Sequence, residues 1–261
     1  MNAQDINSSY NSLQASLEKR ISHGLTLLGS YTYSKSIDDL PVGGNVSEIA
    51  SDQPSALPWD NPLRHQFDRG PSDFDRTHRF VASYVWQLPK LSGKSHLVRS
   101  ALGEWSWSGL LTTQSGAPLT ILSGLTDKND PSGTGLGRAR ALFTGGDPYG
   151  ASGCGTKVHC VDYINQNAFV QPPAGTFGNV GKGWLRWKGA VTWDMGLSKN
   201  FSFTERWRLQ FRAEFFNVFN HVNLRDTSTD TTTMSKNSST FGQLISANEP
   251  RIGQLALKLI F

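Results

Sequence analysis

Long apolar runs are missing from this sequence of 261 residues. None approaches the roughly 18 to 20 residues that a helix needs to cross a bilayer, which excludes a helical membrane protein. Charged residues make up 18% and hydrophobic residues 37%, both low for a soluble enzyme. The first residues, Met1 to Asn7, have neither a basic start nor an apolar stretch, so no signal peptide is present. We therefore expect either a cytosolic protein or a chain that has lost its beginning, and we favour the second.

A concentrated positive charge is also missing, although the net charge is +4. The basic residues are scattered singly and form no block or stripe, for example at Lys19, Lys90, Lys94 and Arg99. A nucleic-acid interface needs such a cluster, so we expect no nucleic-acid partner.

What the sequence does contain is glycine (26 residues), aromatic residues (11%, with 8 Trp) and a repeating alternation of apolar and polar positions. Alternation with period two predicts a β-strand with two different faces. The alternating segments are 12–19, 25–34, 80–87, 105–114, 191–198, 209–215 and 254–261. The sequence therefore predicts an all-β fold, an antiparallel meander of about seven long strands. Alternation alone also fits a soluble sandwich whose polar side faces water.

The connections between these segments decide between the two folds. Short or medium gaps follow the first, third and fifth segments, whereas the second, fourth and sixth are followed by the long stretches 37–77, 115–189 and 218–250. Long structureless connections are uncommon in compact soluble domains. Outer-membrane barrels instead combine tight periplasmic turns with long extracellular loops. We therefore predict a partial transmembrane β-barrel with long extracellular loops and with Phe261 on the short-turn side.

Aromatic residues occur near the predicted strand ends. Tyr31 and Tyr33 lie at the long-loop end, and a second group lies near the short turns, namely Trp86, Trp105, Trp107, Phe201, Phe203 and Trp207. Two such bands are typical of the aromatic girdles at the two bilayer interfaces.

The last eight residues, Gln254-Leu-Ala-Leu-Lys-Leu-Ile-Phe261, resemble the C-terminal signal that bacterial barrel-assembly machinery recognises as an edge strand. Gln254, Leu259 and Phe261 match that pattern. Ala256 stands where the pattern prefers glycine. The resemblance implies outer-membrane lipid and the assembly machinery as partners.

Three further stretches resemble TonB-dependent receptors of the Oar-like kind, which carry a carboxypeptidase-regulatory-like N-terminal domain. Arg212-Ala-Glu-Phe-Phe-Asn-Val-Phe-Asn-His221 is similar to the penultimate strand of these receptors and the start of its loop. Asp73-Phe-Asp-Arg-Thr-His-Arg-Phe80 and Tyr31-Thr-Tyr-Ser-Lys-Ser-Ile-Asp38 fit the Oar-like group. The resemblance covers nearly the whole chain.

The resemblance implies a location in the outer membrane of a Gram-negative bacterium and a barrel of about 22 strands around a plug. It also implies uptake of a ligand driven by TonB. Residues 1–261 account for only about seven strands and contain neither a plug nor the TonB-contacting motif. We therefore interpret the chain as a fragment, with TonB and the plug reached only through a missing N-terminal part.

Cys154 and Cys160 lie close together in the longest connection, and in an exported loop this spacing predicts a disulfide. A metal site with His159 and Asp162 is the alternative, although this cysteine spacing is unusual for zinc. Aromatic residues of the same connection, Tyr149, Tyr163, Phe169 and Trp184, suit ligand capture and passive packing equally well.

Asp194, Arg212 and Glu214 fall on the polar side of neighbouring strands. They are candidates for lumen-facing contacts with a ligand or plug, or for a charge ladder that neutralises itself.

No sequence motif of a catalytic triad, a phosphate-binding loop or a zinc protease is present, so we expect no enzyme activity, no catalytic or metal-binding residues and no cofactor. Asp38-Asp39 and the acidic residues of 127–130 are candidates for loose calcium binding, but neither group has the spacing of an EF-hand.

The leading hypothesis is a receptor and transport component whose loops capture an unidentified ligand. The alternatives are a structural or adhesive barrel, a barrel enzyme such as a lipase or protease, and a secreted carbohydrate-binding sandwich.

Overall fold

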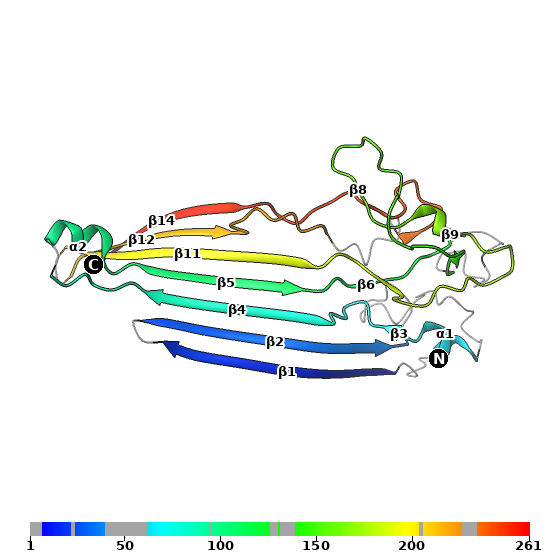
Figure 1. Ribbon diagram of the computed structural model, residues 1–261, viewed down its shortest axis with the longest axis horizontal. Helices are drawn as coiled ribbons and strands as arrows, with labels where there is room; N and C mark the ends of the chain where they lie inside the picture. Colours follow the sequence, from blue (N-terminus) through cyan, green and yellow to red (C-terminus); the bar gives the residue numbers. More distant parts are fainter. Residues whose placement is uncertain are drawn as a thin grey trace.

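The computed structural model of the chain describes residues 7–21, 24–39, 62–93, 95–125, 130, 139–203, 206–225 and 234–261. All seven predicted long strands are present, and each pairs with the next in an antiparallel meander (Figure 1). They are β1 (Ser8–Ile21), β2 (Leu25–Asp38), β4 (His78–Gln87), β5 (Ser106–Gln114), β11 (Ala190–Ser202), β12 (Arg208–Phe216) and β14 (Ile252–Ile260). The predicted all-β meander is confirmed.

The shorter elements lie in the connections. They are β3 (Gly70–Pro71), β6 (Pro118–Leu119), β7 (Leu142–Phe143), β8 (Val161–Asp162), β9 (Phe169–Val170), β10 (Leu185–Arg186), β13 (Gln243–Leu244), the helices α1 (Arg64–Asp68) and α2 (His96–Leu102), and the 3-10 turn η2 (Gln166–Ala168). Of these, β3 pairs with β2 in the main sheet, and the other short strands form three separate pairs.

The strand register places the predicted apolar residues on one face of the sheet. Directly opposed residues share a face, and Ala15, Tyr31 and Phe80 form one such row. On this apolar face Leu17 is 68% exposed, Leu255 73% and Leu257 69%. A sandwich would cover these side chains with a second sheet. The sandwich alternative is therefore wrong.

One glycine of the apolar face has a specific packing role. Gly109 of β5 lies opposite Tyr84 of β4. A Cβ atom at Gly109 would lie 2.4 Å from the Tyr84 ring, which occupies the space that a side chain would fill. The same ring meets Trp107 edge-on, with centroids 5.5 Å apart. Glycine is therefore required at position 109 because the ring of Tyr84, from the neighbouring strand β4, covers this position.

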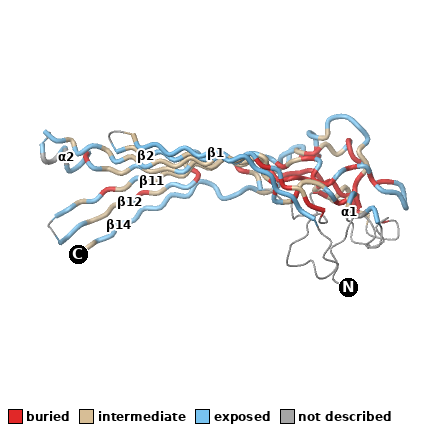
Figure 2. The backbone as a smooth tube through the Cα atoms, turned by 90° about the horizontal axis from the view of Figure 1, so that it is seen from below, coloured by how far each residue is buried: buried red, intermediate tan, exposed pale blue. Residues whose placement is uncertain are grey.

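The two ends of the sheet differ, as the connection lengths predict. The links β2–β4, β5–β11 and β12–β14 all lie at one end, which we call the loop end. The links β1–β2, β4–β5 and β11–β12 lie at the opposite end, called the turn end, together with α2 and the last residue, Phe261 (Figure 1). Seen from below, the sheet is curved, and the buried residues gather at the loop end (Figure 2).

The loop end corrects the expectation of structureless connections. Most described residues of 115–189, together with 234–247, form what we call the loop body, which has its own hydrophobic core. Core members with almost no exposed surface include Ile121, Ile164, Phe169 and Phe241. By contrast, among the buried hydrophobic residues of the described chain, only Ala213 belongs to a long strand. The hydrophobic core of this protein thus lies at the loop end of the sheet, in the connections between the strands.

Candidate functional site

The candidate site is the junction where the loop body meets the loop end of β2 and β4. Three ion pairs cross this junction, each with an acidic residue from β2 or the β2–β4 link and a basic residue from the loop body. They are Asp38 with Lys182, Asp68 with Arg140, and Asp75 with Arg186. The side chains of the three aspartates are at most 4% exposed. The three pairs therefore hold the loop body in one orientation over the strands.

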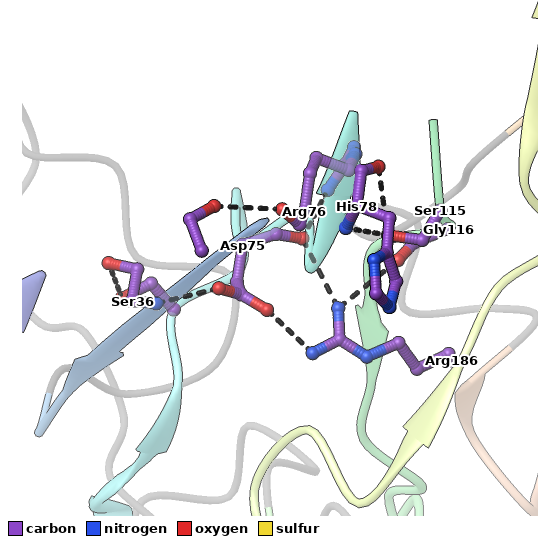
Figure 3. A network of polar contacts seen from close by, with 9 residues as sticks. Ser36, Asp75, Arg76, His78, Ser115, Gly116 and Arg186 are labelled. Atoms are coloured by element: carbon purple, nitrogen blue, oxygen red, sulfur yellow. Dashed lines mark hydrogen bonds and ion pairs between the residues drawn. The ribbon is translucent and has the colours of Figure 1, made fainter. Parts of the chain in front are cut away.

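Asp75 contacts both β2 and the loop body (Figure 3). Its Oδ1 accepts a hydrogen bond from the backbone N–H of Ser36 in β2 at 2.6 Å. Its Oδ2 lies 2.5 Å from Nη2 of Arg186. A buried carboxylate must be paired and hydrogen-bonded to remain charged. Asp75 satisfies both conditions and so links β2 to the loop body.

Arg186 of β10 connects Asp75 to the interior of the loop body. Its Nη1 donates to the carbonyl oxygen of Gly116 at 3.3 Å, just beyond the end of β5. Its own carbonyl oxygen accepts hydrogen bonds from the hydroxyls of Tyr163 and Tyr149. Tyr163 in turn stacks on Trp187, with centroids 5.8 Å apart. The loop aromatics thus support the position of the arginine.

Arg140 and Asp68 form the most deeply buried pair, with both side chains 1% exposed. Burial lowers the pKa of Arg140 from its ordinary value, and the Asp68 carboxylate opposes that shift. The guanidinium also lies 5.5 Å from the ring centre of Phe67. Arginine keeps its charge even when buried, so this pair remains ionic.

Below this network the polar face of the sheet is hollowed. A pocket of about 330 Å³ is lined by residues that include Tyr10, Phe74, Arg76 and Arg79. Arg79 and Thr32 are register partners on β4 and β2, and Thr32 is opposite Gln14 on β1. These three residues form one row across the floor of the pocket. Its wall includes Asp75, which therefore belongs to both the pocket and the junction.

Cys154 and Cys160 are joined by a disulfide, with their Cα atoms 5.6 Å apart. The short ring that they close carries Val158, which is 80% exposed. Next to it, Asp162 accepts hydrogen bonds from the backbone N–H of Cys154 and from both the N–H and hydroxyl of Ser152. These bonds hold the pKa of Asp162 below its ordinary value. Asp162 therefore has a structural role in the loop body.

The three predicted lumen charges are not joined in one ladder. Arg212 pairs with Glu214, two residues along the same strand, and Glu214 accepts a hydrogen bond from Gln254 of β14. Asp194 Oδ1 instead accepts a hydrogen bond of 2.9 Å from the backbone N–H of Asn217, where the chain leaves β12. Two of the three charges thus neutralise each other, and the third caps the end of a strand.

The four residues of the predicted assembly signal lie in or directly after β14. Gln254 and Ala256 pair with Glu214 and Arg212 and share the polar face. Leu259 pairs with Leu209 on the apolar face. Phe261 is 87% exposed, and its ring lies 5.4 Å from that of Trp207.

No group of three or more candidate metal ligands occurs among the described residues. The proposed calcium ligand Asp38 is engaged with Lys182, and Asp39 with His65. Of the other proposed calcium segment, residues 127–129 lie outside the described residues.

Sequence reasoning missed the three ion pairs of the junction. Asp75 lies within one of the receptor-like motifs, but its partner Arg186 is 111 residues further along the chain. The only local signal is that Arg186 is flanked by Leu185 and Trp187, both buried. A basic residue between two buried residues is a candidate for a buried ion pair.

Comparison with known proteins is consistent with this geometry. The sequence matches the family described as outer membrane beta barrel domain over residues 1–254. No curated protein and no solved structure matches the chain. Within the described residues, no helix has the length and hydrophobicity needed to cross a membrane. The chain, an antiparallel meander with an exposed apolar face, therefore belongs to the outer membrane beta barrel domain family and resides in the outer membrane of a Gram-negative bacterium.

Proposed function

We propose that this domain serves a TonB-dependent receptor of the Oar-like kind, in which the loop body contributes to ligand capture at the cell surface. Uptake would require TonB and a plug supplied by another segment of the full-length protein. Lipid would contact the apolar face, and the barrel-assembly machinery would act on β14. The proposed role is binding and transport, without catalysis.

The observation that carries this proposal is the loop body itself. A barrel needs only short links to close, yet here two long connections, 115–189 and 218–250, build a hydrophobic core at the loop end of the sheet. The three ion pairs, each with a buried aspartate, fix that body to β2 and the β2–β4 link. A rigid extracellular body over the lumen is suited to presenting a preorganised binding surface.

The receptor-like motifs have defined positions that support the resemblance. Asn217 exchanges two hydrogen bonds of 2.9 Å with the backbone of His221, and Asn220 Oδ1 accepts the N–H of Arg251. Both asparagines have positive φ angles, 49° and 52°, which asparagine tolerates better than most residues. The motif thus joins the end of β12 to the start of β14.

A deletion in the bacterium that carries the gene tests the receptor proposal. Residues 117–187 are replaced by a short glycine-serine linker, and depletion of solutes from the medium is profiled by mass spectrometry. We expect at least one solute to be taken up by the wild type but not by the deletion strain. The same solute should remain in the medium of a strain lacking TonB. Val158→Ala, at an exposed loop position, serves as the control variant.

The outcome also distinguishes the alternatives. Unchanged solute uptake together with increased sensitivity to detergent would favour a structural barrel and contradict the transport proposal. Loss of surface attachment with unchanged uptake would favour an adhesive one. The amount of protein in the outer membrane, measured for each strain, separates a failure of assembly from a failure of uptake.

A further inference from the structure

The pocket on the polar face contains an arginine that no acidic residue neutralises. The backbone of Arg79 pairs with β2 and β5, but its side chain makes no hydrogen bond or ion pair with any residue that the structure describes. Its opposed neighbours on that face, Thr32 and Gln114, are uncharged. The residues two positions away along the chain, Thr77 just before β4 and Val81 within it, are uncharged as well. Arg79 thus places an unpaired cation in the interior of the barrel.

The acidic residue that lines the pocket does not compensate for this charge. Both carboxylate oxygens of Asp75 are engaged, Oδ1 by the N–H of Ser36 and Oδ2 by Arg186. Its negative charge is therefore already balanced by the loop body. Arg76 also lines the pocket, and its Nη1 donates to the carbonyl oxygen of Asp75 at 3.0 Å.

Aromatic residues supply the other half of the pocket's chemistry. Tyr10 is 59% exposed and Phe74 is 69% exposed, and both line the pocket. Unlike the lipid-facing side chains, Tyr10 lies on the polar face, because its register partner is Ser36. Hydroxyl and amide groups of Ser34, Thr32 and Gln14 complete the lining. The volume of about 330 Å³ lies within the range of small-molecule sites, about 300–1,000 Å³.

From this combination we propose that the pocket binds a small aromatic carboxylate. The guanidinium of Arg79 pairs with the carboxylate, for which its planar fork of N–H donors is suited. Tyr10 and Phe74 contact the ring of the ligand, and the neighbouring hydroxyl and amide groups hydrogen-bond its polar substituents. This inference rests on the proposed receptor function for its biological meaning, and it names the substrate class of that receptor.

Photolabelling in isolated outer membranes tests the inference, because it requires neither TonB nor uptake. Membranes from the native bacterium are irradiated with 4-azidobenzoate or with the neutral 4-azidobenzamide, and labelled peptides are identified by mass spectrometry. We expect 4-azidobenzoate to label peptides containing Tyr10 or Phe74. Excess benzoate should protect these peptides, and excess benzamide should not. Unchanged solute uptake in the deletion strain, together with the expected labelling of the wild type, would contradict only the receptor proposal.

Three variants make the test specific. Arg79→Gln should reduce labelling about tenfold, as expected for the loss of a charged contact. Arg79→Lys, which keeps the charge without the planar fork, should retain part of it. Arg208→Gln removes an arginine from the same face at the turn end and should label like the wild type. The level of each variant in the outer membrane controls for assembly.

Three results would overturn the inference. One is equal labelling by the neutral probe. Another is unchanged labelling of Arg79→Gln. The third is labelling that appears only after a urea wash, because it would mean that another part of the protein occupies the pocket and that Arg79 binds that part instead.

Discussion

Asp75 and Arg186 are 111 residues apart in the sequence, and their Oδ2 and Nη2 atoms lie 2.5 Å apart at the junction between sheet and loop body. The Asp75 side chain has no exposed surface, whereas that of Arg186 is 31% exposed. The pair therefore has one fully buried and one partly solvated partner. Its loss should loosen the loop body without disturbing the strands beneath it.

The variant Asp75→Asn tests this pair. Asparagine keeps an oxygen for the N–H of Ser36 but leaves Arg186 without its counter-ion, and breaking a buried pair costs about 3–5 kcal/mol. We expect the lower end of this range because Arg186 is partly exposed. Proteinase K added to intact cells should then cleave within 115–189 faster than in the wild type. Arg20→Gln, in the exposed pair with Glu18, is the control and should not alter cleavage. Equal protease resistance of Asp75→Asn and wild type would contradict the role of the pair.

The loop body should unfold separately from the barrel. Phe169 is completely buried in its core and contacts the rings of Phe143 and Phe241. Phe169→Ala should cost about 3–5 kcal/mol through the cavity that it leaves. Protease sensitivity of the loop body should rise while the heat-modifiable mobility of the barrel on gels stays unchanged. Val158→Ala, at an exposed position, should change neither. Loss of the folded barrel in Phe169→Ala would show that the two parts are not independent.

Acid should weaken the loop body through Asp162. Hydrogen bonds from Cys154 and Ser152 stabilise its carboxylate and lower its pKa from the ordinary 3.8. The stabilisation is therefore complete above that ordinary value and is lost as the pH falls through the lower pKa of the folded state. Hydrogen exchange of residues 150–163, measured between pH 2 and 6 and corrected for intrinsic exchange rates, should show loss of protection at the acid end. In Asp162→Asn this pH dependence should disappear, and its persistence would point to another titrating group.

Two glycines of the apolar face should respond oppositely to the same substitution. A Cβ atom at Gly109 would overlap the Tyr84 ring, whereas one at Gly29 would meet nothing within 4 Å. Gly109→Ala should therefore lower the temperature at which the barrel unfolds in detergent, since overpacking costs about 1–3 kcal/mol. Gly29→Ala should leave that temperature unchanged or raise it. Similar unfolding temperatures for the two variants would show that Tyr84 moves aside freely.

The strands could be predicted from the sequence because their signal is local. Alternation of side chains along a strand is visible in any short window, and segments such as 254–261 therefore located β14 within two residues. The ends of the strands are predicted less accurately where the alternation of apolar and polar residues stops. β2 extends beyond Ser34 to Asp38, where Ser36 and Asp38 are buried beneath the loop body and the apolar pattern is lost.

The loop body could not be predicted because its contacts are distant in sequence. Its core residues, such as Ile121 and Phe241, are separated by glycine-rich and polar stretches without periodicity. The ion pairs have the same property, since Lys182 is 144 residues from Asp38. A single sequence shows which residues are charged or apolar, but not which of them meet.

The separate core of the loop body has a consequence for how this protein can change. Mutations that reshape the extracellular surface alter packing among residues that do not face the bilayer, so the strands can keep their fit to the membrane while the outer surface diversifies. The three acidic side chains of β2 and the β2–β4 link act as fixed attachment points for that process. A loop body exchanged between related proteins should dock correctly if it brings basic residues at the positions of Arg140, Lys182 and Arg186.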